Sequence, residues 1–364
     1  MPSDLSRRSL LRASAALATG AFLPEAALAS QAAATAPSAG KPALSLTPLE
    51  LKLTHTWTIS RNSSTGKKNG LVTFTADGVT GLGEAAFARV KKAVEGLSPW
   101  EHLAWLERAE KEAGADSQIV AALDMALWDW KGKKLGAPVH RLLGVPANRM
   151  AVTTFTIGID SPEVMQQKVK EGERYPSLKV KVGLPTDEQN VRAIRAVTQK
   201  PVRVDANEGW QTPEEAISRI KWLATMGIEF VEQPMPASKN AAMGAVKAAS
   251  PLPLVADESV LHPGDVPSLA GLFDGINVKL AKCGGITRAY EMAALGRALG
   301  FKLMLGCMIE SSVGIAAGIA VAPLFDWVDL DGNLLVANDP WKGLTLKDGR
   351  WELPSGPGLG VVPA

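Results

Sequence analysis

The chain has 364 residues, of which 46% are hydrophobic and 21% charged, and its formal net charge is +2. This composition excludes a disordered protein, and there is no basic surplus with which to bind a nucleic-acid backbone. Two cysteines exclude a disulfide scaffold, and four histidines leave little room for a histidine-rich metal site. The length corresponds to two domains, or to one α/β barrel with additions.

Residues 1–29 are predicted to be an export signal. Arg7 and Arg8 are followed by an Ala/Leu-rich run over 13–23 and by a small-x-small pattern at 27–29, which together resemble a bacterial twin-arginine signal. A short amphipathic helix or a membrane anchor is the alternative, but the apolar run is too short to span a bilayer. The sequence therefore predicts the twin-arginine export machinery as a partner and a periplasmic or other extracytoplasmic location.

Residues 30–45 are small and rich in alanine and proline, which predicts a disordered linker. No later segment has 18 consecutive apolar residues, so the mature protein is not expected to be embedded in a membrane. In an oxidising compartment Cys283 and Cys307 could form a disulfide, but two free thiols that pack as small hydrophobic side chains are the favoured interpretation.

Residues 46–148 are predicted to form an α+β capping domain. Two runs alternate as strands do, and the dipeptides Asn69-Gly70 and Asp77-Gly78 supply turn chemistry. The predicted strands cover 46–57 and 71–74. Apolar residues then recur at helical spacing over 100–113 and 117–135.

Residues 149–332 are predicted to form a barrel of parallel strands. Short apolar runs alternate here with helical segments, as such a barrel requires. The runs are 152–157, 177–182, 202–205, 228–232, 254–257, 275–279, 302–305 and 327–329. An open doubly wound sheet is the alternative, but no glycine-rich turn follows the first strand. The irregular segment 333–364 is expected to pack back on the cap.

Three successive predicted strands end in a carboxylate, namely Asp205, Glu232 and Asp257. In parallel barrels the active site gathers at the carboxyl ends of the strands, so the three side chains should converge. Any one of them alone could belong to a structural salt bridge. Three oxygen ligands without a nearby histidine favour a hard cation, with Mg²⁺ the first choice and Mn²⁺ the second, one per subunit, and they argue against zinc.

Lys181 and Lys279 end predicted strands on either side of the carboxylates. They could face a bound substrate from opposite sides. A nearby cation and a second ammonium, which Lys179 could provide, would lower the pKa of a lysine toward that of a general base. The alternative is that these lysines only neutralise the carboxylates.

Five segments resemble motifs of the enolase superfamily, in order and in spacing. They are 178–183, 204–207, 231–234, 256–259 and 278–285. The resemblance covers the whole mature chain and implies a modified (β/α) TIM-like barrel with an N-terminal α+β capping domain. It also implies a lysine or histidine base acting with Mg²⁺ that stabilises an enediolate.

The lysine pair resembles the muconate-lactonising subgroup, and the absence of any histidine after His262 argues against the histidine-dependent dehydratases and mandelate racemase-like enzymes. Within that subgroup, Asp329 and Asp331 resemble the Asp-x-Asp element with which dipeptide epimerases hold the substrate's free α-ammonium. The segment 306–312, which contains Met308, resembles their seventh-strand loop. A solvated turn is the alternative for the two aspartates.

Other residues receive roles only through this resemblance. The segment 58–64 looks like a mobile loop that closes over the substrate, and its Arg61 could reach the substrate's side chain, as in enzymes that take an Ala-Glu dipeptide. Lys179 and Met308 are expected to contact substrate, and Asn207 and Glu258 to support the metal ligands from behind.

The expected function is a Mg²⁺-dependent dipeptide epimerase that inverts the α-carbon of the C-terminal residue by two-base proton transfer, with a small dipeptide, such as murein-derived Ala-Glu, as substrate. An N-acylamino-acid racemase or an o-succinylbenzoate synthase on the same scaffold is the alternative enzyme. A binding protein that kept the fold without the chemistry is the alternative class. A homo-oligomer is compatible with each of these interpretations.

Overall fold

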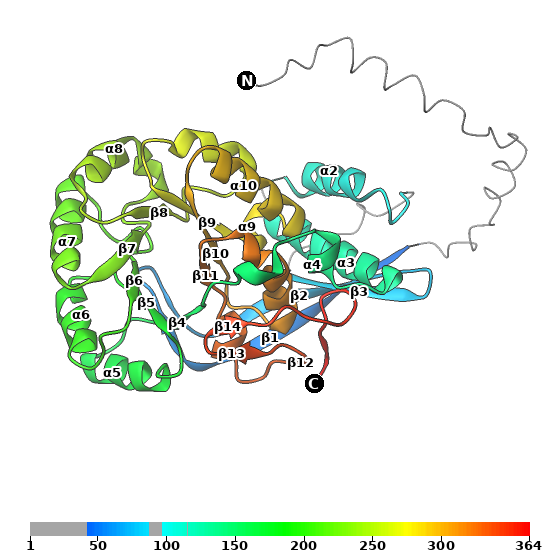
Figure 1. The fold of residues 1–364 in the computed structure, drawn as a ribbon, viewed down its shortest axis with the longest axis horizontal. Helices are drawn as coiled ribbons and strands as arrows, with labels where there is room; N and C mark the ends of the chain where they lie inside the picture. Colours follow the sequence, from blue (N-terminus) through cyan, green and yellow to red (C-terminus); the bar gives the residue numbers. More distant parts are fainter. Residues whose placement is uncertain (1–41, 87–96, 115) are drawn as a thin grey trace, which may run out of the picture. The chain divides into compact units, whose positions relative to one another are not determined.

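The computed structural model describes residues 42–86, 97–114 and 116–364. The predicted export signal and the predicted linker up to residue 41 lie outside these ranges (Figure 1). Within the described ranges, none of the helices has both the length and the apolar character needed to cross a membrane.

The cap begins with an antiparallel sheet of three strands within the described residues, in the order β1 (Ala43–Thr58), β2 (Ser63–Ala76) and β3 (Val79–Ala86). The predicted turn at Asp77-Gly78 joins β2 to β3, and both residues have positive φ, 50° and 74°, as a tight hairpin turn requires. The sequence interpretation missed β3, because its run VTGLGEAA contains two glycines and lacks a clear alternation.

Two expectations about this sheet are wrong. Asn69-Gly70 is not a turn but lies inside β2, paired with β1 on one side and β3 on the other, and both residues are buried. The predicted linker also extends too far, because β1 already begins at Ala43, which pairs with Thr75. The small residues before position 46 therefore form a strand because a long partner strand offers its backbone groups, which local composition cannot reveal.

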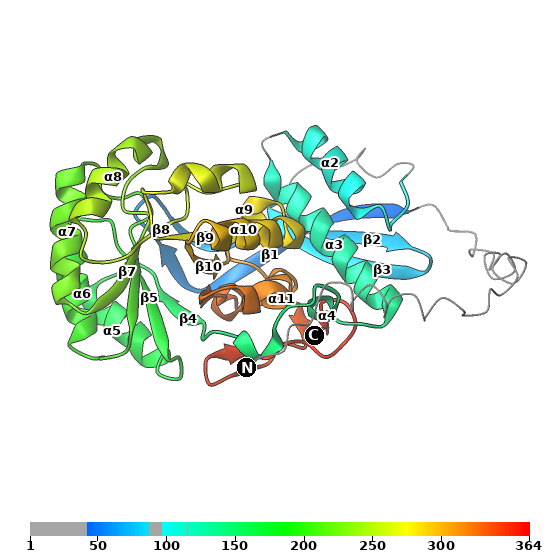
Figure 2. The same ribbon diagram turned by 45° about the horizontal axis from the view of Figure 1, so that its top comes forward.

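The helices α2 (His102–Ala113) and α3 (Ser117–Leu135) agree with prediction, and α3 lies across β2 and β3 (Figure 2). A side chain at Gly81 or Gly83 of β3 would collide with the α3 backbone, so these glycines permit the close approach. Phe74 packs edge-on against Trp105 and Trp130 in the core between sheet and helices.

The second part of the chain is a parallel barrel, as predicted. Its eight strands pair only with their neighbours in sequence, without the reversal of strand order that an open doubly wound sheet would show. The strands are β4 (Thr154–Ile157), β5 (Ser177–Lys181), β6 (Val202–Asp205), β7 (Ile228–Glu232), β8 (Leu254–Ala256), β9 (Gly275–Lys279), β10 (Lys302–Gly306) and β11 (Trp327–Asp329). The Thr153 hydroxyl accepts a hydrogen bond from Leu330 N at 2.8 Å and joins the first strand region to the last.

The connecting helices lie outside the strands, and Figure 1 shows α5 to α8 as an outer layer. They are α5 (Pro162–Glu171), α6 (Asp187–Arg195), α7 (Pro213–Thr225), α8 (Asn240–Ala249), α10 (Ile286–Ala298) and α11 (Ser312–Val321), with the short helices α4 (Val139–Leu142) and α9 (Leu280–Cys283). In α5 and α7 a Ser or Thr N-cap precedes a proline in the first turn, which is a strong local helix start.

The C-terminal segment contacts both the cap and the barrel. Val336 bridges to Leu53 of β1, and Leu359 N donates to Asp129 Oδ1 of α3 at 2.8 Å. Trp351 donates its indole N–H to Leu330 O beyond β11. Its short strands are β12 (Trp341–Lys342), paired with β15 (Val362–Pro363), and β13 (Leu346–Lys347), paired with β14 (Arg350–Trp351).

Candidate active site and metal centre

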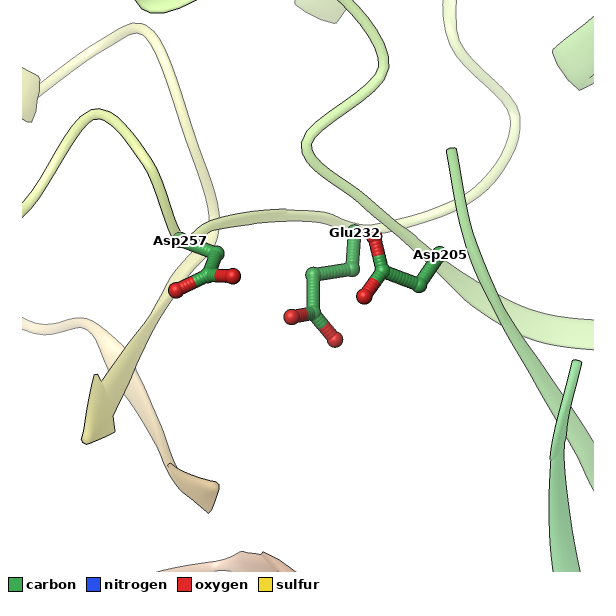
Figure 3. A group of neighbouring side chains, drawn as sticks. All are labelled: Asp205, Glu232 and Asp257. Carbon is green, nitrogen blue, oxygen red and sulfur yellow. The ribbon is translucent and has the colours of Figure 1, made fainter. Parts of the chain in front are cut away.

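The three carboxylates that the sequence singled out converge at the carboxyl ends of neighbouring strands. Asp205 ends β6, Glu232 ends β7, and Asp257 follows β8 directly. All three are fully buried, one oxygen of each lies within 4.8 Å of the others, and their side chains point toward a common space (Figure 3). Three buried like charges at this separation are costly unless cations face them.

The donor set fits a divalent cation with hard oxygen ligands. Burial, followed by the charge of Asp205, raises the pKa of Glu232 to about 7, so the protein alone holds this carboxylate poorly in its ionised form. A cation placed between the three groups would relieve that repulsion. Carboxylate oxygens without histidine or cysteine match the preference of Mg²⁺ or Mn²⁺.

Two lysines approach the carboxylates from the flanking strands. Lys181 of β5 lies 2.6 Å from Asp205 Oδ2, and Lys279 of β9 lies 3.0 Å from Asp257 Oδ2. Burial lowers the pKa of Lys279, but the charges of Asp257, Glu232 and Asp205 together outweigh burial and leave the pKa raised overall. At Lys279 the expected lowering of the pKa is therefore not produced by the protein's own groups, because the carboxylates outweigh burial and the second ammonium, and it would depend on a bound cation.

Lys179 is a bridge between acidic groups. Its ammonium is buried and lies 2.8 Å from Glu232 Oε2, 3.3 Å from Asp205 Oδ2 and 2.8 Å from Asp329 Oδ2. One side chain thus joins the three-carboxylate cluster to the carboxylate at the end of β11. Since all of its acidic partners are buried as well, these contacts persist without competition from water.

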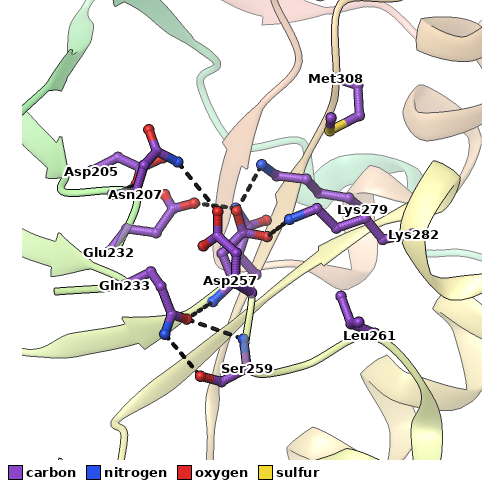
Figure 4. Close-up of polar contacts among 12 residues, drawn as sticks. Asp205, Asn207, Glu232, Gln233, Asp257, Ser259, Leu261, Lys279, Lys282 and Met308 are labelled. Carbon is purple, nitrogen blue, oxygen red and sulfur yellow. Dashed lines mark hydrogen bonds and ion pairs between the residues drawn. The ribbon is translucent and has the colours of Figure 1, made fainter. Parts of the chain in front are cut away.

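Three side chains around the carboxylates were not singled out individually from the sequence. Asn277 donates to Glu232 Oε1 at 2.8 Å, and Lys282 lies 2.7 Å from Asp257 Oδ1. Gln233 accepts the backbone N–H of Asp257 at 2.9 Å and fixes the start of that loop (Figure 4). Asn277 precedes Lys279 by two positions on β9, so strand alternation was the available signal that both face the site.

Asn207 and Glu258, the expected supports, lie next to the metal-ligand candidates. Asn207 N donates to Asp205 Oδ1 at 2.9 Å, and its side-chain amide is 3.5 Å from Glu258 Oε1. Burial, and then the charge of Asp257, raises the pKa of Glu258. Both residues contact the ligand side chains or each other from the loops that follow β6 and β8.

Asp329 and Asp331 are 4% and 3% exposed, which excludes a solvated turn. Thr154 and Thr156 of β4 donate hydroxyl hydrogen bonds to Asp329, and Thr156 N donates to Asp331 Oδ2 at 2.6 Å. Burial, and then the charge of Asp329, raises the pKa of Asp331 to about 7. Burial raises the pKa of Asp329, but the contact with Lys179, the hydrogen bond from Thr154 and the charge of Lys181 together keep this pKa low. Among the described residues, Lys179 is the one lysine that contacts the pair directly.

The loop between β1 and β2 is attached to the barrel. Arg61 pairs with Glu208 and with Glu258, the latter at 2.7 Å, and the Ser60 hydroxyl donates to Asn207 O at 2.9 Å. Arg61 is thus engaged by two carboxylates of the barrel. Its expected contact with a substrate side chain would compete with both of them.

A cavity of about 650 Å³ lies over the strand ends and brings these groups together. Its wall includes Lys179, Lys181, Lys279, Asp257, Asp329, Asp331, Arg61, Asn207, Glu258 and Met308. Asp205 and Glu232 are not part of this wall, but both contact Lys179, which is. Cys307 also lines the cavity, and both Cys283 and Cys307 are free thiols. A small molecule that enters the cavity therefore meets carboxylates and lysines together in its wall.

Comparison with known proteins assigns the chain to a protein family. Residues 162–364 match the family described as enolase C-terminal domain-like, and residues 50–144 match the mandelate racemase/muconate lactonizing enzyme N-terminal domain. The chain belongs to the enolase C-terminal domain-like family. Its matched ranges cover the cap as well as the barrel, so the predicted membership of the enolase superfamily is confirmed.

Relatives of this family member are named as epimerases. It is 39% identical to the L-Ala-D/L-Glu epimerase of Bacteroides thetaiotaomicron, with 89% of this chain and 88% of the relative covered. It is 43% identical to the L-Ala-D/L-amino acid epimerase of Pedosphaera parvula, with 85% and 95% covered. Among solved structures, the dipeptide epimerase of Cytophaga hutchinsonii, complexed with Mg and D-Ala-L-Val, superimposes with a TM-score of 0.84 at 26% identity, covering 88% of this chain and 95% of that one.

Proposed function

We propose that this protein is a Mg²⁺-dependent dipeptide epimerase that inverts the α-carbon of the C-terminal residue. The observation that carries the proposal is the buried pair Asp329 and Asp331, which Lys179 joins to the carboxylate cluster. A buried acidic pair that contacts one lysine directly favours a further positive charge beside it, and the free α-ammonium of a dipeptide supplies one. An N-acylated amino acid has no such charge, so the pair favours the epimerase over the racemase and synthase alternatives.

Asp205, Glu232 and Asp257 would hold the cation. Its chemistry when bound is to attract electron density from the substrate carboxylate, which makes the α-hydrogen more acidic and stabilises the enediolate. Asn277 holds Glu232 in position, and Lys282 and Gln233 hold Asp257, through the contacts described above, while Asn207 N donates to Asp205. Manganese would fit the same oxygen ligands.

Lys181 and Lys279 are proposed as the two bases. They come from β5 and β9, on either side of the strands that carry the carboxylates, and both line the cavity. One lysine removes the α-hydrogen from one face of the substrate, and the other delivers a proton to the opposite face. Two bases on two faces are what inverts a stereocentre, whereas a single base would return the original configuration.

Hydrogen exchange tests the proposal directly. Purified protein with Mg²⁺ is incubated in D₂O with L,L- and L,D-dipeptides, and NMR follows loss of the α-hydrogen of the C-terminal residue. We expect exchange and epimerisation that stop when EDTA is added and return with excess Mg²⁺. Absence of exchange across a broad dipeptide library would contradict the proposal. Asp329→Asn and Asp331→Asn should weaken dipeptide turnover, and an N-acylamino-acid racemase should be indifferent to both.

The setting of the reaction is also a proposal. A twin-arginine signal in residues 1–29 would export a folded, metal-loaded enzyme to the periplasm, where murein-derived peptides such as Ala-Glu arise. Fractionation of cells that produce the tagged full-length chain, compared with an Arg7→Lys/Arg8→Lys double variant, tests the route. We expect the wild-type protein in the periplasm and the variant in the cytoplasm. Export of the double variant would contradict the twin-arginine route.

A further inference from the structure

One cation in the wall of the cavity makes no ion pair with any residue in 42–86, 97–114 or 116–364. Arg61, Lys179, Lys181, Lys279 and Lys282 each lie within 4 Å of a carboxylate oxygen. Lys67 also lines the cavity, and within the described part of the chain it makes no ion pair. By contrast, the next residue, Lys68, is exposed and pairs with Glu50 at 3.6 Å.

The position of Lys67 on β2 directs it toward the site. It lies opposite the buried Leu51 in the β1–β2 ladder and two residues before Asn69, so both Lys67 and Asn69 face the same side of the strand. Asn69 donates to Ile309 O at 3.0 Å, which shows that this side faces the loop after β10. Met308 and Ile309 of that loop share the cavity wall with Lys67. Lys68 faces the opposite side.

The acidic group whose charge interacts with Lys67 is Glu310, which is buried in the same loop. Burial, followed by the charge of Glu84, raises the pKa of Glu310 to about 8. At pH 7 Glu310 is therefore mostly protonated and does not neutralise the Lys67 ammonium. A half-buried ammonium without a counter-charge is stabilised by any anion that the cavity admits.

We infer that Lys67 is a specificity-determining residue that binds a side-chain carboxylate of the dipeptide substrate. The inference rests on the proposed function and assigns to Lys67 the role that the sequence suggested for Arg61. Arg61 is engaged by Glu208 and Glu258, whereas Lys67, in the same cavity wall, makes no ion pair with the residues that the structure describes. The carboxylate could belong to either residue of the dipeptide, and both sources share the chemistry that Lys67 recognises.

The test compares three dipeptides, L-Ala-L-Glu, L-Glu-L-Ala and L-Ala-L-Ala, in the full-length Mg²⁺-loaded enzyme. Wild type, Lys67→Met and Lys67→Arg are compared, with Lys68→Met as the matched control on the other face of the strand. The readout is kcat/KM for α-hydrogen exchange, separated into kcat and KM. We expect the ratio of acidic to neutral substrate to fall roughly 10- to 100-fold in Lys67→Met, mainly through KM, as loss of a partly desolvated charge pair predicts.

Lys67→Arg should restore most of the ratio, and Lys68→Met should leave it at the wild-type value. The acidic dipeptide whose KM rises identifies which residue carries the recognised carboxylate. An unchanged ratio in Lys67→Met, or an equal loss on all three dipeptides, would overturn the role of Lys67 and leave the epimerase proposal standing. Failure of the wild type to exchange any dipeptide would overturn both.

Discussion

Lys179 and Asp329 form a buried ion pair, with Nζ and Oδ2 2.8 Å apart, that links the two acidic parts of the site. The same ammonium lies 2.8 Å from Glu232, so one side chain serves both the carboxylate cluster and the pair at the end of β11. Of the groups that lower the pKa of Asp329, Lys179 contributes the largest effect, so one lysine on β5 stabilises the ionised form of this carboxylate as well as contacting the cluster.

Replacement of Lys179 tests this link. We expect Lys179→Met to lower the free energy of unfolding by about 3–5 kcal/mol at pH 8, because buried carboxylates lose their cation. Without Lys179 the pKa of Asp329 rises, so the loss should shrink as pH falls and the carboxyl group becomes protonated. Urea unfolding at pH 8 and pH 5 measures this, with the exposed Lys170→Met of α5 as control. An equal loss at both pH values would show that Asp329 is not the affected group.

The pH dependence of substrate binding should follow the protonation state of Asp331. Its pKa is raised to about 7, so below pH 7 it is mostly neutral and binds an ammonium weakly. We expect kcat/KM for a dipeptide to rise with pH through about 7, through a falling KM, until the substrate's own α-ammonium loses its proton near pH 8. The Asp331→Asn variant should lose this dependence of KM. A KM that stays constant from pH 6 to 7.5 in the wild type would contradict the assignment.

The two proposed bases should fail in different ways. We expect Lys181→Ala and Lys279→Ala each to lower epimerisation by about 10²- to 10⁴-fold, the usual contribution of a general acid or base. Each variant should keep α-hydrogen exchange with one diastereomer only, and the two variants should keep opposite ones. Exchange of L,L- and L,D-substrates in D₂O, followed by NMR, measures this. Retention of the same diastereomer by both variants would mean that the lysines do not face opposite sides.

Arg61 is expected to hold the loop rather than to select the substrate. Arg61→Ala should lower kcat/KM by a similar factor, roughly tenfold, for acidic and neutral dipeptides alike, because it frees residues 59–62 from Glu208 and Glu258. Stability should change by no more than about 1 kcal/mol, since the side chain is exposed. Amide hydrogen exchange of this loop should become faster. The control variant Arg192→Ala on α6 should change neither kcat/KM nor the amide exchange of the loop. A loss confined to acidic dipeptides would assign Arg61 to the substrate.

The strands of the barrel and its charged residues were predictable because the signal is local. Each parallel strand is a short apolar run, and the residue that ends it is the one that enters the site. For Asp205, Glu232 and Lys279, this pattern alone predicts a position in the site. The cap was harder to predict. Asn69-Gly70 has the composition of a turn and yet lies within β2, where Asn69 reaches both Glu84 and Ile309.

The sequence by itself determined which side chains gather at the mouth of the barrel, because strand alternation and repeat length bring successive strand ends to one rim. Only the tertiary structure decided which of them pair. Lys179 binds Asp329 across 150 positions and Arg61 binds Glu258 across 197, whereas Lys67 makes no ion pair with any residue that the structure describes. The first pairing depends on how the barrel brings β5 and β11 together, and the second on how the cap rests on the barrel. Distances between groups far apart in the chain decide where each charge is neutralised, and no local pattern encodes those distances.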